Sequence, residues 1–122
     1  MKLDEVKFRG HTNETSRGER ALVDIAKSRD YCLSEQHPRG RHKARVFASA
    51  LGFTVTEADV LRQALLKAAL EGEATQRERD DYGQRYMVDF QIGGPRGRAM
   101  VRSSWIILEG EDFPRMTSCH VL

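Results

Sequence analysis

The feature that most constrains the fold of this chain is a change in the spacing of its apolar residues near Gly83. Between residues 41 and 71 apolar side chains recur every three or four positions, which is typical of amphipathic helices. From Tyr86 onward they alternate with polar side chains, which is typical of strands that bury one face. This order predicts an α+β fold, with two N-terminal helices packed on one face of an antiparallel three- to four-stranded sheet.

Capping and turn residues indicate where these elements begin and end. The first helix is predicted from Arg41 to Leu51, because Gly52 suits the position that ends a helix. The second is predicted to begin with Thr56 as its N-cap and to close at Gly72. Residues 21–26 fit either a first strand or a helical turn. The remaining pattern predicts a charged loop over residues 75–82, strands over residues 86–92, 98–108 and 114–122, and turns over residues 93–97 and 109–112.

Length and composition indicate a single small domain. With 122 residues and a hydrophobic fraction of 39%, the chain can build one core but not two. Residues 1–20 are polar and offer few anchors, so we expect a flexible N-terminal arm ahead of one domain over residues 21–122. No apolar run approaches the roughly 18–20 residues of a membrane span, and the first residues do not resemble a secretory signal. We therefore expect a cytoplasmic protein without a membrane partner.

Positive charge is concentrated in the first part of the chain. Residues 1–50 carry 11 Lys and Arg against 7 Asp and Glu, whereas residues 51–122 carry 9 against 11. Residues 36–47 include no acid but contain four cations and two histidines, namely Arg39, Arg41, Lys43, Arg45, His37 and His42. Such a segment favours an anionic partner and marks Arg39, Arg41 and Arg45 as candidate RNA contacts. The alternative is an ordinary solvated helix start.

Candidate chemistry has to come from side chains alone, because the sequence has no metal-binding motif and no cofactor fingerprint. No metal and no cofactor are therefore predicted, and Cys32 and Cys119 are expected to be free thiols. The candidate catalytic residues are His42, Lys43, Arg102, Ser104, Thr117 and His120.

Histidines beside cations suit metal-independent cleavage of RNA. In this reaction a base removes the proton of the ribose 2′-OH, and an acid protonates the leaving 5′-oxygen. A cation holds the charge that develops on the phosphorane. Each candidate also has a structural interpretation. His42 at a helix start is more often a surface residue, and His120 is compatible with capping a strand face. Arg102 is ordinary solvated surface unless its side of the sheet forms a cleft, and Ser104 fits as a small strand residue.

Several short motifs follow one another along the chain. They are Lys27 with Asp30-Tyr31-Cys32-Leu33, His37-Pro38-Arg39-Gly40-Arg41-His42-Lys43-Ala44-Arg45-Val46-Phe47, Leu51-Gly52, Tyr82-Gly83, Val101 with Trp105-Ile106, and Pro114-Arg115-Met116-Thr117. Their order resembles an uncharacterised bacterial family, domain of unknown function 6883, over about Lys27 to Leu122. Lys43, Trp105 and Thr117 match the helix lysine, strand tryptophan and ending threonine of that family's pattern. His42 and His120 are not part of the pattern, and Cys32 stands where leucine is usual.

The resemblance implies a layout similar to the fold of RelE-like and colicin-type RNase toxins, and a role as the toxin half of a bacterial toxin–antitoxin pair. We therefore predict a metal-independent ribonuclease that acts on RNA and is neutralised by a cognate antitoxin protein, with a homodimer left open. The alternative is a non-catalytic module that binds nucleic acid or protein. An immunity-type partner is a third interpretation, which the basic balance of residues 1–50 disfavours.

Overall fold

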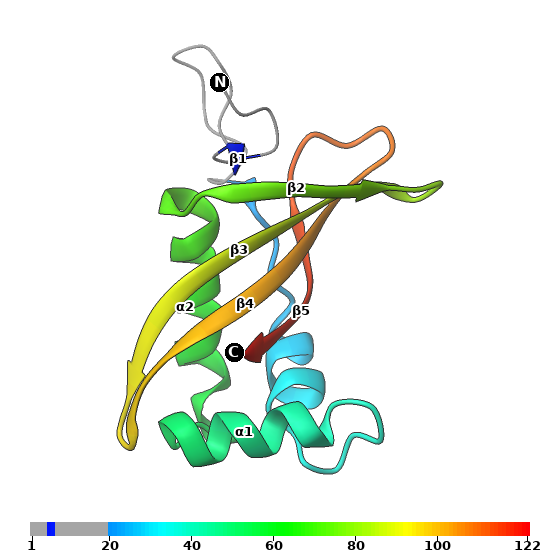
Figure 1. The fold of residues 1–122 in the computed structure, drawn as a ribbon. Helices are drawn as coiled ribbons and strands as arrows, with labels where there is room; N and C mark the ends of the chain where they lie inside the picture. Colours follow the sequence, from blue (N-terminus) through cyan, green and yellow to red (C-terminus); the bar gives the residue numbers. More distant parts are fainter. Residues whose placement is uncertain (1–4, 7–19) are drawn as a thin grey trace.

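The computed structural model describes residues 5–6 and 20–122. The flexible arm predicted over residues 1–20 falls outside this part of the chain, except for Glu5, Val6 and Arg20. The described residues form a layer of helices and a twisted antiparallel sheet (Figure 1). The predicted α+β class is therefore confirmed.

The helical segments of the described chain precede its long strands. They are η2 (Lys27–Cys32), a π-helical turn, α1 (Arg41–Leu51), the 3₁₀ turn η3 (Val55–Glu57) and α2 (Ala58–Glu71). α1 has the predicted bounds, and Gly52 ends it with a φ of 78°, a left-handed conformation that glycine adopts readily. None of the described helices has the length and hydrophobicity of a transmembrane segment.

The start of the second helix differs from the prediction, because Thr54 and not Thr56 is the capping residue. The side-chain oxygen of Thr54 accepts the backbone N–H of Thr56 at 3.4 Å, and Glu57 Oε1 accepts the backbone N–H of Thr54 at 2.7 Å. This capping box starts η3, which leads directly into α2. Both threonines are followed by acids, but only Thr54 has a glutamate three residues later. The capping-box spacing therefore distinguishes them.

The strands of the sheet lie in the order β1-β2-β3-β4-β5, and all neighbours are antiparallel. They are β1 (Glu5–Val6), β2 (Ala74–Arg79), β3 (Gly83–Gly94), β4 (Gly97–Leu108) and β5 (Arg115–Val121). β3 and β4 form a long hairpin around the predicted turn, with Gly94 opposite Gly97. The three predicted strands are confirmed as β3, β4 and β5, with slightly different ends.

β2 corrects the prediction of a charged loop over residues 75–82. It pairs with β3, with Thr75 opposite Met87 and Gln76 opposite Tyr86, and only residues 80–82 connect the two strands. Of the six residues of β2 only Ala74 is buried, so the strand lacks the apolar alternation on which the prediction depended. Backbone pairing to an inner strand holds these charged residues in the sheet instead.

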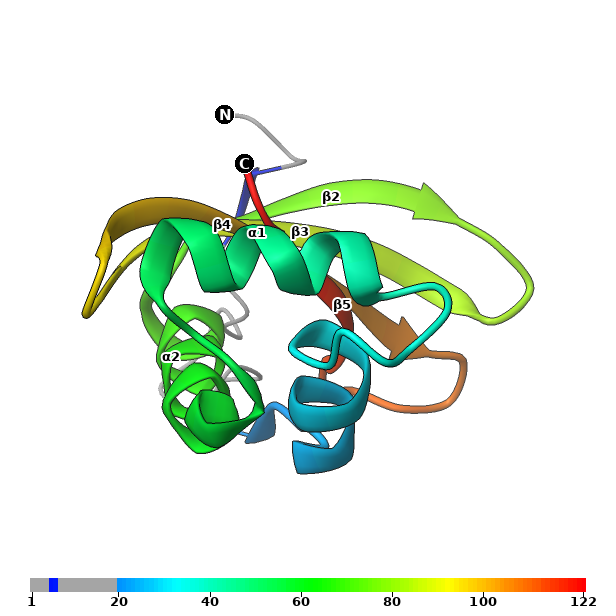
Figure 2. The same ribbon diagram turned by 90° about the horizontal axis from the view of Figure 1, so that it is seen from below.

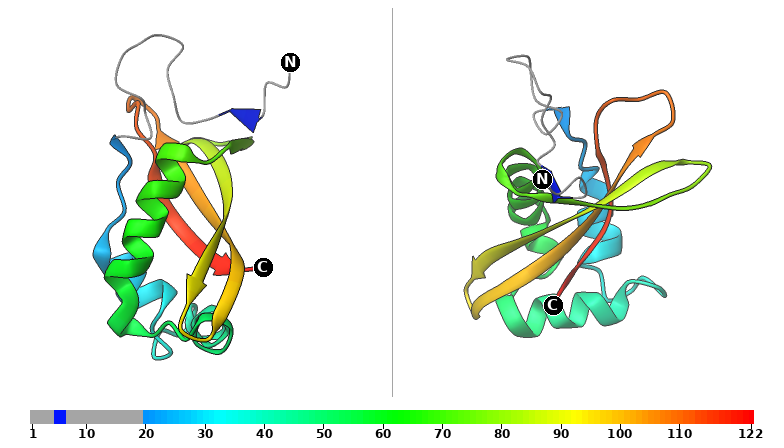
Figure 3. Two further views of the ribbon diagram at one scale, coloured as in Figure 1. Left: turned by 90° about the vertical axis from the view of Figure 1, so that its left-hand side faces the viewer. Right: turned by 45° about the horizontal axis from the view of Figure 1, so that its top comes forward.

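The helices cover one face of the sheet, and the core lies between the two layers (Figure 3, left). Seen from below, α1 runs across one end of the two layers (Figure 2). On β4, Val101, Ser103 and Trp105 point inward and are fully buried. Trp105 Nε1 donates to Ser103 Oγ at 2.8 Å, and Ser103 Oγ donates to Val88 O at 2.7 Å. This buried indole and hydroxyl are therefore both hydrogen-bonded. The helices contribute Phe47, Leu51, Leu61 and Leu65 to the core.

Residues 21–26 contain both of the structures considered for them. Leu22 forms an isolated parallel bridge with Arg115, in which Leu22 N donates to Pro114 O at 2.9 Å and Leu22 O accepts from Met116 N at 3.0 Å. A helical turn then begins at Ile25 and continues into η2. β5 is therefore held between β4 on one side and Leu22 on the other.

Candidate functional site

The face of the sheet that the helices leave uncovered carries a polar pocket. The register places Arg102 of β4 directly between Asp89 of β3 and His120 of β5. Because successive residues of a strand point to opposite faces, Arg102 and Ser104 lie on the face opposite the buried Val101. The pocket has a volume of about 390 Å³, and its polar lining is formed by Arg77, Glu78, Arg85, Arg102, Ser104, Thr117 and Ser118, together with the hydroxyl-bearing Tyr86.

Arg102 is fixed in place by a carboxylate on the neighbouring strand. Its Nε and Nη2 atoms donate to the two oxygens of Asp89, each at 2.9 Å. Asp89 raises the pKa of the Arg102 guanidinium above its ordinary value, chiefly through these hydrogen bonds. Only two of the five N–H donors of the guanidinium are used in this pair. Arg102 is therefore oriented and still has donors for an anion.

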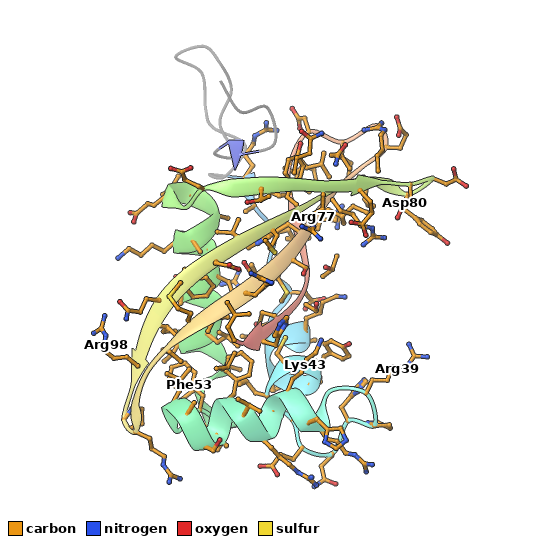
Figure 4. The ribbon with its side chains drawn as sticks, viewed as in Figure 1. Arg39, Lys43, Phe53, Arg77, Asp80 and Arg98 are labelled. Carbon is orange, nitrogen blue, oxygen red and sulfur yellow. The ribbon has the colours of Figure 1, made fainter. Side chains whose placement is uncertain are left out.

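His120 lies on β5 within the electrostatic influence of Lys43, where α1 contacts that strand. Partial burial lowers the pKa of His120 below its ordinary value of 6.5, and the positive charges of Lys43 and then Arg102 lower it further. Asp89 acts in the opposite direction, but the net shift is downward. Lys43 rises from α1 toward the end of β5 (Figure 4). A neutral imidazole beside two cations is suited to accepting a proton near a bound anion.

Thr117 reaches the pocket through an irregularity in β5. Ser104 pairs with Ser118 and Trp105 pairs with Met116, so Thr117 is an extra residue at a bulge. Its Oγ1 donates to Ser104 O at 3.1 Å, and its carbonyl accepts Lys27 Nζ from η2 at 3.4 Å. A bulge often re-aims a side chain next to a functional site, and here it brings the Thr117 hydroxyl beside Ser104.

The structure therefore places three of the sequence candidates, Arg102, Ser104 and Thr117, in the lining of one pocket. His120 lies opposite Arg102 on the neighbouring strand, and the charge of Lys43 acts on His120 from α1, but neither residue lines the pocket. The others do not line the pocket. His42, Arg39, Arg41 and Arg45 are exposed, and Arg45 approaches Glu35 at 3.7 Å. Arg39 points away from the sheet into solvent (Figure 4). His42 is adjacent to Lys43 in α1, but successive helical residues differ by about 100° in direction.

Sequence reasoning missed several residues that line or support the pocket, namely Arg77, Arg85, Asp89 and Ser118. Asp89 could have been found by pairing residues outward from the turn at Pro95-Arg96, since this pairing sets Asp89 opposite Arg102. Arg77 gave no such signal, because its strand has no apolar alternation. In Figure 4 its side chain lies over the uncovered face, below β2. Among the described residues no group of three or more His, Cys, Asp or Glu is placed to hold a metal ion.

Comparison with known proteins identifies the family of the chain. No curated protein matches the sequence. Residues 15–122 match the family described as Domain of unknown function (DUF6883). This match spans most of the 122 residues and includes every element from η2 to β5. The chain therefore belongs to the DUF6883 family.

Proposed function

We propose that this domain is a metal-independent ribonuclease that acts on RNA in the cytoplasm, as the toxin component of a bacterial toxin–antitoxin pair. The observation that carries the proposal is the position of His120. It lies opposite Arg102 and near the charge of Lys43, and Arg102 lines the polar pocket with Ser104 and Thr117. A base, cations and hydroxyl groups are the groups that RNA cleavage needs.

Each of these residues has a definite task in the proposed reaction. His120, with its lowered pKa, removes the proton of the ribose 2′-OH, and the oxygen then attacks the adjacent phosphorus. Arg102 and Lys43 stabilise the negative charge of the phosphorane. The Lys43 ammonium supplies the proton to the leaving 5′-oxygen, and the hydroxyls of Ser104 and Thr117 orient the phosphate.

The order of the elements supports a further part of the proposal. In this proposal the domain shares its fold with RelE-like and colicin-type RNase toxins, and the order of helices followed by an antiparallel sheet supports it. In this proposal the antitoxin protein covers the uncovered face and blocks access of RNA to the pocket. Because the pocket lining holds three arginines, Arg77, Arg85 and Arg102, against one acid, Glu78, an acidic segment of the antitoxin would complement it.

A non-catalytic nucleic-acid-binding module is the second candidate. The ion pair of Arg102 with Asp89 favours it, because the charge of the central arginine is already partly compensated. In that case His120 and Lys43 contact phosphate without transferring a proton, and substitution of either one weakens binding only modestly.

The test is growth of a bacterial host after tightly induced expression of the parent chain and of Lys43→Ala and His120→Asn. Arg41→Ala is the matched control, because Arg41 is an exposed cation of the same helix but is not among the charges that shift the pKa of His120. We expect arrest by the parent and by Arg41→Ala, and normal growth with the other two variants at equal levels of folded protein.

The purified parent is then incubated with RNA in excess chelator, and the fragments are examined for 2′,3′-cyclic phosphate ends. Cleavage that persists in chelator supports the metal-independent mechanism. Normal growth with abundant folded parent protein would overturn the toxin proposal. RNA binding without cleavage would establish the second candidate.

A further inference from the structure

The two cysteines of the chain, widely separated in sequence, touch in the core. Cys32 is the last residue of η2, Cys119 lies on β5, and 87 positions separate them. Cys119 Sγ donates a hydrogen bond to Cys32 Sγ at 3.5 Å, and each residue is 1% exposed. Both are free thiols in the structure.

The packing of η2 against β5 explains this contact. Cys119 faces inward on β5, where it pairs with the buried Ser103 of β4. η2 is anchored to the same strand by the hydrogen bond from Lys27 Nζ to Thr117 O. The sulfur atoms of a disulfide are about 2 Å apart, so these two need to approach by roughly 1.5 Å.

The surroundings make the two thiols unequal. The hydrogen bond from Cys119 is the largest effect on Cys32, and it lowers the pKa of Cys32 against the opposing effect of burial. The positive charges of Lys27 and Lys43 lower it further. The pKa of Cys119 is raised well above its ordinary value, because it donates to Cys32 and is buried. Cys32 therefore ionises more readily than Cys119, and the thiolate is the reactive form of a cysteine.

We propose that Cys32 and Cys119 form a redox site, at which hydrogen peroxide converts the two thiols into an intramolecular disulfide. Cys32 first ionises, and its thiolate attacks one peroxide oxygen, so that the O–O bond breaks. The departing hydroxide takes up the proton that Cys32 released on ionisation and leaves as water. The Cys119 sulfur then attacks the sulfenic acid at Cys32. The S–S bond forms, and the sulfenic hydroxyl leaves as a second water with the Cys119 proton.

The reaction oxidises two thiols by two electrons and reduces one peroxide to two waters. It does not depend on any activity toward RNA, because it involves only the two sulfurs and the oxidant.

The bond would join η2 covalently to the inward side of β5, within the core. Cys119 lies between Ser118 of the pocket and His120, so oxidation would fix the strand that carries these residues. A disulfide that closes a loop of this length restricts the unfolded chain strongly. We expect the temperature of unfolding to rise by about 10 °C on oxidation and to return on reduction.

The test uses the full chain, reduced and then treated with an equimolar amount of hydrogen peroxide. The protein is denatured, alkylated with iodoacetamide and weighed by mass spectrometry. Since the chain has 2 cysteines, the number of alkylated thiols reports the outcome directly. We expect both thiols to be lost together, both to be recovered with dithiothreitol, and a linked peptide pair containing Cys32 and Cys119.

Two variants test the order of the steps. Cys119→Ser should accumulate a sulfenic acid at Cys32 that dimedone traps, whereas Cys32→Ser should leave Cys119 unreactive at the same peroxide concentration. Two alkylated thiols in the treated parent would overturn the proposal. Oxidation that dithiothreitol does not reverse, or a disulfide only between two chains, would also overturn it. The parent experiment remains decisive if either variant fails to fold.

Discussion

Arg102 and Asp89 lie directly opposite each other on β4 and β3, and two parallel hydrogen bonds of 2.9 Å join them. Their side chains keep 37% and 30% of their surface exposed, so the pair stands at the edge of the pocket and remains in contact with water. An exposed pair of this kind contributes little to stability. Its effect is to fix the direction of the guanidinium and to reduce its attraction for a phosphate.

Asp89→Asn should strengthen RNA binding. The substitution removes the charge that competes with phosphate for Arg102 and loosens the two hydrogen bonds. We expect the dissociation constant for a short RNA to fall by a factor of roughly 3 to 10 at moderate salt. The salt dependence should also steepen, by about one additional phosphate contact. Filter binding over a series of potassium chloride concentrations measures both quantities.

Glu73→Gln is the control for this substitution. It removes the same charge from an exposed position just before β2, outside the pocket lining. An equal gain in affinity from both variants would mean that net charge alone governs binding. Arg102 would then not be a specific RNA contact.

RNA cleavage should require the neutral form of His120. Burial and then the charges of Lys43 and Arg102 hold the pKa of His120 below 6.5, so the imidazole is uncharged at neutral pH. We expect kcat/KM to be level near pH 7 and to fall about tenfold per pH unit below a breakpoint under 6.5. His120→Gln should lose the reaction. A residual activity in this variant with the same acid limb would assign the base to another group.

The lowered pKa of His120 also predicts that the stability of the protein depends on pH. The folded protein binds the proton of His120 less tightly than the unfolded chain does, so protonation favours unfolding. The contribution of neutral His120 is present above pH 6.5 and is lost as the pH falls through the folded-state pKa. Urea denaturation at pH 7.5 and at successively lower pH values should show a smaller decline for His120→Gln than for the parent. If the free energy of unfolding declines equally in the parent and in the variant, the pKa of His120 is not lowered by folding.

Thr54→Ala should destabilise the domain and Thr56→Ala should not. The first removes the capping box with Glu57, which costs about 1 kcal/mol in the free energy of unfolding. Thr56 contributes its backbone N–H to the cap, and alanine retains that group. We expect its effect to stay within about 0.5 kcal/mol. The urea midpoints of the two variants are compared. If Thr56→Ala lost more stability than Thr54→Ala, Thr56 would be the capping residue.

Gly83→Ala should be far more damaging than Gly110→Ala, although both glycines have positive φ values, 155° and 85°. A Cβ at Gly83 would meet Ile107 O and lie 2.8 Å from Leu108 Cα, so β3 and β4 would have to separate. A Cβ at Gly110 has no atom within 4 Å. We expect a loss of about 3 kcal/mol or more for the first and about 1–2 kcal/mol for the second. Thermal unfolding of both variants tests this difference in stability. Equal losses from the two substitutions would contradict the close packing at Gly83.

The parts of the fold that follow from local spacing could be predicted from the sequence. α1 and its end at Gly52 follow from an apolar stripe and a glycine, and the β3–β4 hairpin follows from alternation on both sides of a glycine-rich turn. β2 could not be predicted in this way. Its position depends on backbone pairing with β3, a tertiary interaction that its charged side chains do not encode.

The candidate site also depends on tertiary interactions that the local sequence does not encode. Sequence chemistry selected Lys43, Arg102 and Thr117 but could not show that Arg102 and Thr117 line one pocket. The bulge at Thr117 shifts the register of β5 by one residue, and such a shift exchanges the faces of all residues beyond it. The helical position of Lys43 indicates its direction from α1, but not that β5 lies there.

The pairing of Leu22 with Pro114 and Met116 has a kinetic consequence. Leu22 lies near the start of residues 20–122, and Pro114 and Met116 lie near their end. Almost the whole intervening chain must therefore close into a loop before β5 is held on both sides. Loop closure of this kind costs entropy before the contacts compensate for it. We expect the β3–β4 hairpin and the helices to gather first and β5 to dock late. Because β5 carries Thr117 and His120, the proposed site would come into existence only at the last stage of folding.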